Sequence, residues 1–161
     1  MLVKDCIDKF NEYISIKEHI SEDKVINLYN LIESELAQEY FPIYKEETWS
    51  HYPKVYYKEF SDMPIRIINC TNKTYFLQSE FIMSKNLKPL GKVKYSYLPI
   101  AKIFSSDKSE YDNNFRNCIT CGMICEYYLQ RGEYELASEW NHKYKNEIRN
   151  LYIEVRKSDE S

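Results

Sequence analysis

The stretch that decides the fold runs from Phe115 to Tyr144 and reads FRNCITCGMICEYYLQRGEYELASEWNHKY. Apolar side chains recur there at intervals of three and four, on both sides of Gly132, which is the spacing of one face of an α-helix. Gly132 stands just past the first apolar stripe, at the position where glycine commonly ends a helix. We therefore predict an antiparallel helical hairpin that turns at Gly132, with the small residues Gly122 and Ala137 permitting close approach of its helices.

Two further helices are expected before this hairpin, at residues 3–16 and 22–40. The first has apolar side chains at helical spacing. The second follows Ser21, a favourable N-cap, and begins with two acidic residues that suit the positive end of a helix. Pro42 ends it, because the residue before a proline is pushed out of the helical conformation.

The periodicity changes in the middle of the chain. Residues 92–98 alternate with period two, which places Val93, Tyr95 and Tyr97 on one face of a strand and Lys92, Lys94 and Ser96 on the other. Strands are also expected at 54–60, 65–70 and 74–83, after a connection with some apolar anchors at 42–53. Together they would form an antiparallel meander with one polar, basic face.

This layout predicts an α+β fold, mainly an α-helical bundle with a C-terminal helical hairpin and an inserted small antiparallel β meander. We expect a single domain over residues 1–161, with N-terminal helices at 1–41, the β module at 54–99, and the helical hairpin and tail at 108–157. A chain of 161 residues is long enough to bury a good core.

The composition excludes several classes of protein. The chain has 16 tyrosines but only three glycines, and it contains neither a Rossmann fingerprint nor a P-loop. No apolar run approaches about 20 residues, so no membrane span is expected. The first residues carry acidic groups and no apolar run, which argues against a secretory signal. We interpret the five cysteines as reduced thiols in a cytosolic setting.

Charge divides the chain into three blocks. Residues 1–50 carry five basic and eleven acidic groups, residues 51–107 nine and four, and residues 108–161 eight and ten. Lysines gather around one hairpin of the basic block and could follow a nucleic-acid backbone. The alternative is a solvated sheet face whose edge lysines prevent aggregation. The lysines are Lys85, Lys88, Lys92 and Lys94.

No sequence pattern indicates a catalytic site, and we expect the chain not to be an enzyme and to bind no cofactor or metal. Cys118, Cys121 and Cys125 have a spacing that could ligate zinc or an iron–sulfur cluster, but they lie in an amphipathic helix, where cysteine acts as a small hydrophobe. The acidic run at 33–39 is interpreted as the solvated face of a helix. The three histidines, which are scattered along the chain, are His19, His51 and His142.

Two stretches taken together resemble head–tail connector (adaptor, head-completion) proteins of tailed bacteriophages. The first, Gly91–Pro99, is a strand with a Y-x-Y-x-P exit, and the second, Tyr127–Tyr144, is a hairpin of the type "aromatic-rich helix, GxYExA, W, Y". The resemblance covers roughly residues 21–155. It implies a homo-oligomeric ring, twelve-fold in the family, that joins the capsid portal to the next neck or tail protein and extends the DNA channel.

The layout shared with this family also suggests contact residues. The C-terminal segment would face the portal, through Arg149, Tyr152, Arg156 and Lys157. The lysine hairpin would supply tail-side or channel contacts, including loose contact with DNA. The protein would then belong to the virion neck, and to the host cytoplasm during assembly, and the first 20 residues would be an extra helix.

A second interpretation comes from another class of protein. Residues 129–144 also resemble half of a tetratricopeptide-type helix pair, which would make the chain a helical protein-interaction module or regulator. No second copy follows at a period near 34 residues, and a β meander has no place in a helical solenoid.

Overall fold

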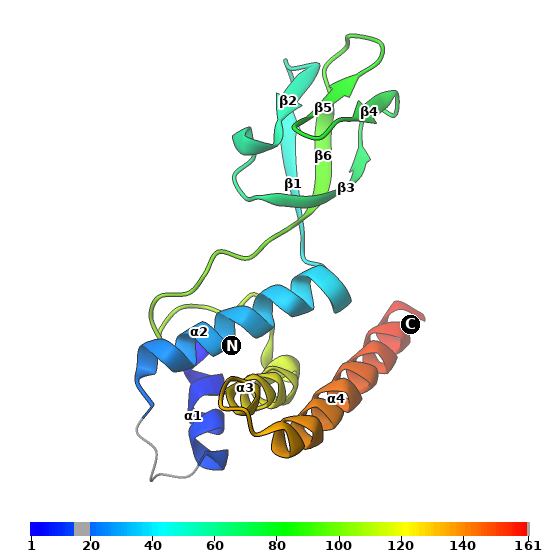
Figure 1. The fold of residues 1–161 in the computed structure, drawn as a ribbon. Coiled ribbons are helices and arrows are strands. Elements are labelled where there is room, and N and C mark those ends of the chain that lie inside the picture. Colours follow the sequence, from blue (N-terminus) through cyan, green and yellow to red (C-terminus); the bar gives the residue numbers. More distant parts are fainter. Residues whose placement is uncertain (15–19, 161) are drawn as a thin grey trace. The chain divides into compact units, whose positions relative to one another are not determined.

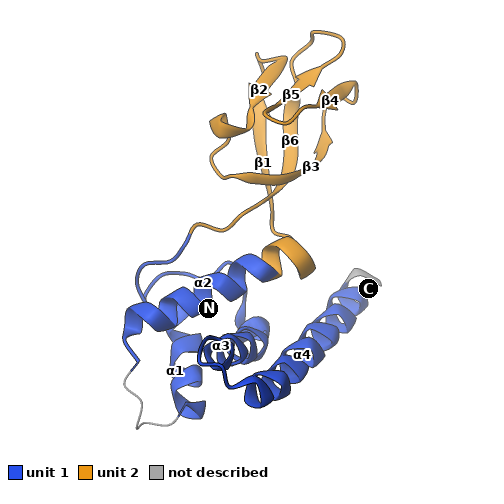
Figure 2. Cartoon of the chain, viewed as in Figure 1, with its two compact units in different colours: residues 1–35, 101–161 blue, residues 36–100 orange. Residues whose placement is uncertain are grey.

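The structure of the chain, a computed structural model, describes residues 1–14 and 20–160. It has two compact units, residues 1–35 with 101–161 and residues 36–100 (Figure 2). The first unit is built from α-helices and is called the helical unit below. The second unit contains the strands, is inserted between two helices of the first, and is called the β unit.

The helical unit contains four helices at the expected places, but the second, expected at 22–40, ends as an α-helix at Glu35 and residues 36–40 form a π-helix (Figure 1). The C-terminal residues of the first expected helix, 15 and 16, lie outside the described residues. A short 3₁₀ turn, Asn113–Phe115, precedes the third helix. The helices are α1 Val3–Tyr13, α2 Glu22–Glu35, α3 Arg116–Gln130 and α4 Tyr134–Glu160.

Helix α3 is the centre of the helical unit. It is apolar on more than the single face that the periodicity indicated, because Met123, Ile124 and Tyr127 are buried as well as Cys118 and Ile119. The other three helices pack against it. The rings of Phe10 in α1 and Tyr127 in α3 meet edge to face, with their centroids 5.8 Å apart, a favourable geometry for two aromatic rings.

The turn between α3 and α4 has the expected form. Gly132 adopts a φ of +73°, which glycine tolerates without steric cost, and its amide donates to the carbonyl of Leu129. Close packing of the hairpin is confirmed at both small residues. The thiol of Cys125 lies 3.3 Å from the Ala137 carbonyl oxygen, and a Cβ added at Gly122 would lie 3.1 Å from the ring of Tyr144.

The β unit consists of two three-stranded antiparallel sheets. Their strand orders are β1-β6-β3 and β2-β5-β4, so most pairs join strands that are not consecutive, unlike those of a simple meander. A π-helix, Leu36–Tyr40, precedes the first strand, and a 3₁₀ turn, Tyr57–Glu59, follows the second. The strands are β1 Tyr44–Trp49, β2 Lys54–Tyr56, β3 Pro64–Cys70, β4 Tyr75–Leu77, β5 Phe81–Ser84 and β6 Gly91–Tyr97.

Strand β6 lies at the centre of its sheet, and it follows the expected alternation except at Ser96, which was expected on the polar face but is buried. Val93 and Tyr95 are fully buried, whereas Lys92 on the opposite face is exposed. Tyr95 also donates a hydrogen bond from its hydroxyl to Glu47 of β1. The apolar core of the β unit comprises Val55, Phe60, Ile67, Cys70, Ile82, Leu90, Val93 and Tyr95.

Three expectations for the strands were wrong. Of residues 54–60 only Lys54–Tyr56 form a strand, because a 3₁₀ turn follows at once. Residues 42–53 were expected to be a connection, but β1 lies within them. Its sequence, YKEETW, is too polar to reveal a strand by hydrophobicity, because backbone pairing with β6 and alternate half-buried positions define it. Residues 74–83 form not one strand but two, β4 and β5, which pair with each other.

The predicted α+β class, with a C-terminal helical hairpin and an inserted antiparallel β part, is confirmed. The single-domain organisation stays a prediction. Tyr111, in the segment before α3, is buried and packs on Phe115 with ring centroids 4.6 Å apart.

Candidate functional site

A buried polar cluster forms where α2 meets the chain segment before α3. Its centre is Glu33, whose side chain is 1% exposed. The cluster, called the Glu33 cluster below, consists of Tyr29, Glu33, Lys102, Ser109 and Glu110. The expectation that the acidic run at 33–39 is a solvated helix face is therefore wrong for Glu33, because this side of α2 is covered by residues 102–110.

Each group of the Glu33 cluster has a partner within the chain. The Tyr29 hydroxyl donates to the Glu33 carboxylate at 2.5 Å and also contacts the Ser109 hydroxyl. The Glu110 amide donates to the same carboxylate at 3.1 Å. The Lys102 ammonium lies 3.5 Å from Glu33 and 3.1 Å from the side chain of Glu110. Burial, and secondarily the charge of Glu33, raise the pKa of Tyr29, so its hydroxyl stays protonated as a donor.

The arrangement anchors a loop. Residues 102–109, called the elbow below, are also held by the side chain of Asn30, which accepts from the Lys102 amide at 2.7 Å and donates to its carbonyl at 2.9 Å. The Asp107 carboxylate accepts from the amides of Ile103 and Phe104 at 2.8 and 2.9 Å. These backbone donors lower the pKa of Asp107 and keep it ionised.

The start of α1 fixes the other side of the elbow. The amide of Val3 donates to the Asp107 carbonyl at 3.0 Å, and the amide of Lys4 donates to the Ser105 carbonyl at 2.8 Å. These bonds satisfy amides that the first turn of a helix leaves unpaired. The elbow is thus rigidly positioned, yet the side chains of Ile103 and Phe104 are 68% and 63% exposed.

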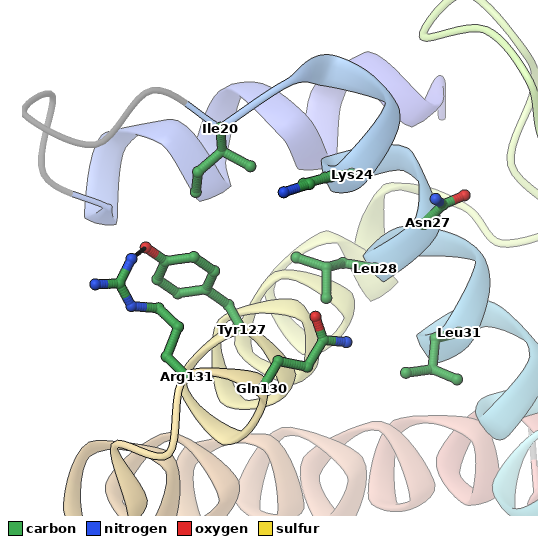
Figure 3. A pocket seen from close by; sticks show the side chains of 8 residues that line it. All are labelled: Ile20, Lys24, Asn27, Leu28, Leu31, Tyr127, Gln130 and Arg131. Carbon is green, nitrogen blue, oxygen red and sulfur yellow. Dashed lines mark hydrogen bonds between the residues drawn. The ribbon is translucent and has the colours of Figure 1, made fainter.

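A groove of about 640 Å³ lies between α2 and the C-terminal part of α3. Apolar side chains of both helices line it, and polar and basic groups stand at its rim (Figure 3). Arg131 donates to the Tyr127 hydroxyl at 2.8 Å and extends across this ring. The groove, called the α2–α3 groove below, is lined by Ile20, Lys24, Asn27, Leu28, Leu31, Tyr127, Gln130 and Arg131.

The expected portal-facing residues lie on the last part of α4. Arg149, Tyr152, Arg156 and Lys157 are all exposed. Among the residues of α4 whose side chains are described, Leu151 is the last buried one, and Tyr152, Ile153 and Val155 are 41%, 48% and 42% exposed. The structure therefore brings these candidates together on one helix end, with apolar residues among them.

The four candidate lysines separate into two groups. Lys85 and Lys88 are exposed in the loop after β5, whereas Lys92 and Lys94 project from one face of β6. Lys92 lies 3.7 Å from Glu46, and Lys94 lies over the ring of Tyr44. The β6 pair therefore faces partners within its own sheet, and Lys85 and Lys88 are the more accessible charges.

The cysteine motif lies in the core of the helical unit. Cys118 and Cys125 are buried, and Cys121 is partly so. Burial raises the pKa of all three thiols, that of Cys121 to about 11, which keeps them neutral near pH 7. Among the described residues, no group of three or more His, Cys, Asp or Glu could hold a metal ion. His51 and His142 are exposed, and His19 lies outside the described residues.

This burial predicts the reactivity of the thiols. At mildly alkaline pH, we expect a chromogenic disulfide reagent to modify Cys121 slowly in the folded protein and the other thiols far more slowly. All five thiols should react at once in urea, because unfolding exposes them and removes the cause of their raised pKa. Rapid modification of two or more thiols in the folded chain would contradict the packing role assigned to them.

Comparison with known proteins adds no family to this description. No family model matches the chain, and no curated protein matches it either. Within residues 1–14 and 20–160, none of the helices has both the length and the apolar character that crossing a membrane requires.

The sequence patterns missed the Glu33 cluster, the elbow and the α2–α3 groove. One signal was available, because Glu33 falls on the same helical face as the apolar residues Ile26 and Tyr29, where a solvated acid is not expected. Apart from Tyr29, the partners of Glu33 come from residues about 70 to 80 positions later, and no local sequence pattern predicts such a pairing.

Proposed function

We propose that the chain is a structural virion protein, a ring-forming head–tail connector that joins the capsid portal to the tail and extends the DNA channel. The observation that carries the proposal is the end of α4, where an amphipathic helix continues beyond the part that its own unit covers. The family resemblance supplies the portal as the partner for this segment.

Helix α4 has 27 residues and is about 40 Å long, against 15 residues for α3. From Tyr152 to Ser158 every residue is exposed. Isolated helices shorter than about 12–15 residues are marginal in water, and most helical stability in proteins comes from packing. The exposed apolar residues Ile153 and Val155, together with Arg156 and Lys157, suit a partner surface that has apolar and acidic groups.

The surface composition supports a subunit that is surrounded by others. Tyrosine is enriched at interfaces because it buries a large area with little loss of conformational entropy. Tyr52 and Tyr134 are 56% and 70% exposed, and Tyr44 is 51% exposed. Aromatic side chains exposed to this extent suit contacts with neighbouring subunits of the ring and with the next neck or tail protein. The family resemblance makes this ring a dodecamer.

The lysines of the β unit would serve a second contact. Residues 36–100 carry nine basic and six acidic groups, a net charge of +3. Exposed Lys85 and Lys88 would face the tail side or the channel, and any contact with DNA would be loose and sensitive to salt. The protein would reside in the virion neck and, during assembly, in the host cytoplasm.

Binding to the portal protein encoded in the same genome tests the proposal. We expect the wild-type chain to assemble on portal rings and Ile153→Asp to weaken this assembly by about tenfold or more, because a charge would enter an apolar contact. Asn146→Asp is the matched control, since Asn146 is also exposed on α4 and receives the same charge. Assembly should be scored by co-sedimentation with the portal.

Two outcomes would overturn the proposal. One is a wild-type chain that never binds the portal ring. The other is equal binding by Ile153→Asp and Asn146→Asp, which would remove the end of α4 from the contact. Circular dichroism of both variants verifies that the fold is retained.

A helical protein-interaction module remains the second candidate, and the α2–α3 groove is the observation that favours it. Its volume of about 640 Å³ falls within the usual range of ligand pockets. Saturable capture of short peptides by a monomer, lost in Leu31→Glu, would support this function over the connector.

A further inference from the structure

The outer face of the sheet β2-β5-β4 carries aromatic rings that lie outside the core of the β unit. Strand β5 is at the centre of this sheet, and its residue Ile82 is buried in the core together with Val55 of β2, to which it is paired. Side chains alternate between the two faces along a strand, so the residues on either side of Ile82 lie on the opposite face. This face, called the β5 face below, carries Lys54, Tyr56, Phe76, Phe81 and Met83.

The three rings of the β5 face are neighbours that solvent can reach. Tyr56 and Phe81 are opposite each other in the pairing of β2 with β5, and their ring centroids are 5.8 Å apart. The ring of Phe76 in β4 lies 6.4 Å from that of Phe81. Tyr56 is 37% exposed, and Phe76 and Phe81 are half-buried. Each of these rings therefore keeps part of its surface in water.

Lysines stand among these rings. The Lys54 ammonium lies 4.2 Å from the centroid of the Phe81 ring and 4.9 Å from that of Tyr56. The Lys58 ammonium lies 5.7 Å from the Tyr56 centroid, and Lys85 is exposed directly after β5. Within the described part of the chain, none of the three lysines forms an ion pair. Their positive charge is therefore available to a partner.

The charge of the surrounding segments favours an anionic partner. Residues 53–60 and 71–90, which form this sheet and its loops, carry five basic and two acidic groups. One of the two acids, Glu59, uses its carboxylate to accept a hydrogen bond from the Tyr56 amide at 2.7 Å. A net positive charge beside exposed rings suits a partner that has both negative groups and flat apolar surfaces.

Single-stranded nucleic acids have both of these features. Unpaired bases stack on aromatic side chains with little regard to sequence, while basic side chains follow the phosphates. In a duplex the bases already stack on one another, so the rings would contribute little. The acidic surface of a protein would use the lysines and leave the ring faces without a matching group.

We propose that the β5 face binds single-stranded nucleic acid, with bases stacked on its three rings and phosphates bound by its lysines. DNA and RNA both have these groups, and either can occupy the face. This activity goes beyond the connector function proposed above and does not rest on it, because the contact needs neither the portal nor a ring.

Fluorescence anisotropy with the full chain tests the site. The probes are labelled oligothymidylate and oligouridylate of about 20 nucleotides, long enough to cover such a face, and a duplex of the same length. At low salt both single strands should bind at least about tenfold more tightly than the duplex. Tighter binding of one single strand would identify DNA or RNA as the partner, and equal binding would show that the shared groups suffice.

Variants at Tyr56 test the stacking. Tyr56→Ala should bind both single strands about tenfold more weakly, because one stacking ring is lost. Tyr56→Phe keeps the ring and should bind as the wild type does. Tyr56 is exposed, so both variants should fold, and circular dichroism verifies this.

A variant at Lys54 tests the phosphate contact. Lys54→Gln should weaken binding and reduce the slope of log affinity against log salt by about 0.7, the contribution of one phosphate of a single strand. Tyr56→Ala should leave this slope unchanged. Arg66→Gln is the matched control, because Arg66 is an exposed base in β3 of the other sheet, and its affinity should stay within about twofold of wild type.

Several results would overturn the site. These are failure of both single strands to bind at low salt, equal affinity for the duplex, and Tyr56→Ala that binds as wild type does. Displacement of the oligonucleotide by polyglutamate as readily as by unlabelled oligonucleotide would also overturn it and would assign the face to an acidic protein. Portal assembly is a separate measurement with Ile153→Asp, so failure of the site and failure of the connector function are distinguishable.

Discussion

Replacing Glu33 with alanine should lower the free energy of unfolding by about 3 kcal/mol or more, the usual cost of removing one partner from a buried ion pair. Lys102, 10% exposed, would lose Glu33 and keep Glu110 as an acidic partner, and the Tyr29 hydroxyl and Glu110 amide would each lose an acceptor. Urea unfolding followed by far-UV circular dichroism measures the change. Glu33→Gln should cost less, because the amide oxygen still accepts hydrogen bonds.

Glu39→Ala provides the control, since Glu39 belongs to the same acidic run but is exposed. A change of at most about 0.5 kcal/mol is expected there. If Glu33→Ala and Glu39→Ala destabilised the chain equally, Glu33 would not be the buried anchor described above. Because the cluster holds the elbow, amide hydrogen exchange of residues 103–107 should also accelerate in Glu33→Ala and not in the control.

Replacing Gly122 with leucine should destabilise the helical unit by about 2–3 kcal/mol through overpacking. A Cβ at this position would lie 3.0 Å from a methyl group of Ile32 and 3.1 Å from the ring of Tyr144. Three helices meet at this point, because these neighbours belong to α2 and α4. The remaining atoms of leucine would force the helices apart, which a lower midpoint of thermal unfolding would reveal.

A second substitution separates overpacking from a general loss of structure. Ile32→Ala alone should destabilise, since it opens a cavity in the core. Combined with Gly122→Leu it should recover part of the loss, because the truncated side chain makes room for the larger one, and a double-mutant cycle measures this coupling. Strictly additive effects would contradict the close approach of the helices at Gly122.

The sequence could predict the helices because their signals are local. Gly132 marks the α3–α4 turn by its conformational freedom, and the stripes on either side fix the length of each helix. The alternation of Val93 and Tyr95 with Lys92 and Lys94 defines β6 in the same way. In each case the residues that form the element also carry its pattern.

The parts of the fold and of the candidate site that the sequence could not predict depend on residues distant in the chain. Strand β1 is polar, and only its pairing with β6 makes it a strand. Glu33 is buried because residues 102–110 cover it, and the pairing of β1 with β6 joins segments that are separated by most of the β unit. The α2–α3 groove and the exposure of Phe104 are likewise products of packing, which hydrophobic periodicity does not encode.

The candidate portal-facing residues on α4 were predicted in part: their place on a helix end is shown, and their role is not tested. The sequence marked Arg149, Tyr152, Arg156 and Lys157 from the layout shared with the connector family, and the structure places them on an exposed helix end. Their contact with a portal stays a proposal. The structure adds Ile153 and Val155, exposed apolar neighbours whose burial by a partner would be favourable.

The central claim is that copies of this chain form a ring on the capsid portal, and the most direct test is the mass and negative-stain image of the complex formed when the two proteins are mixed. We predict that each portal ring gains one further ring, with a mass increase that corresponds to as many copies of this chain as the portal has subunits. Portal rings that keep their mass and outline at saturating amounts of the chain would contradict the account.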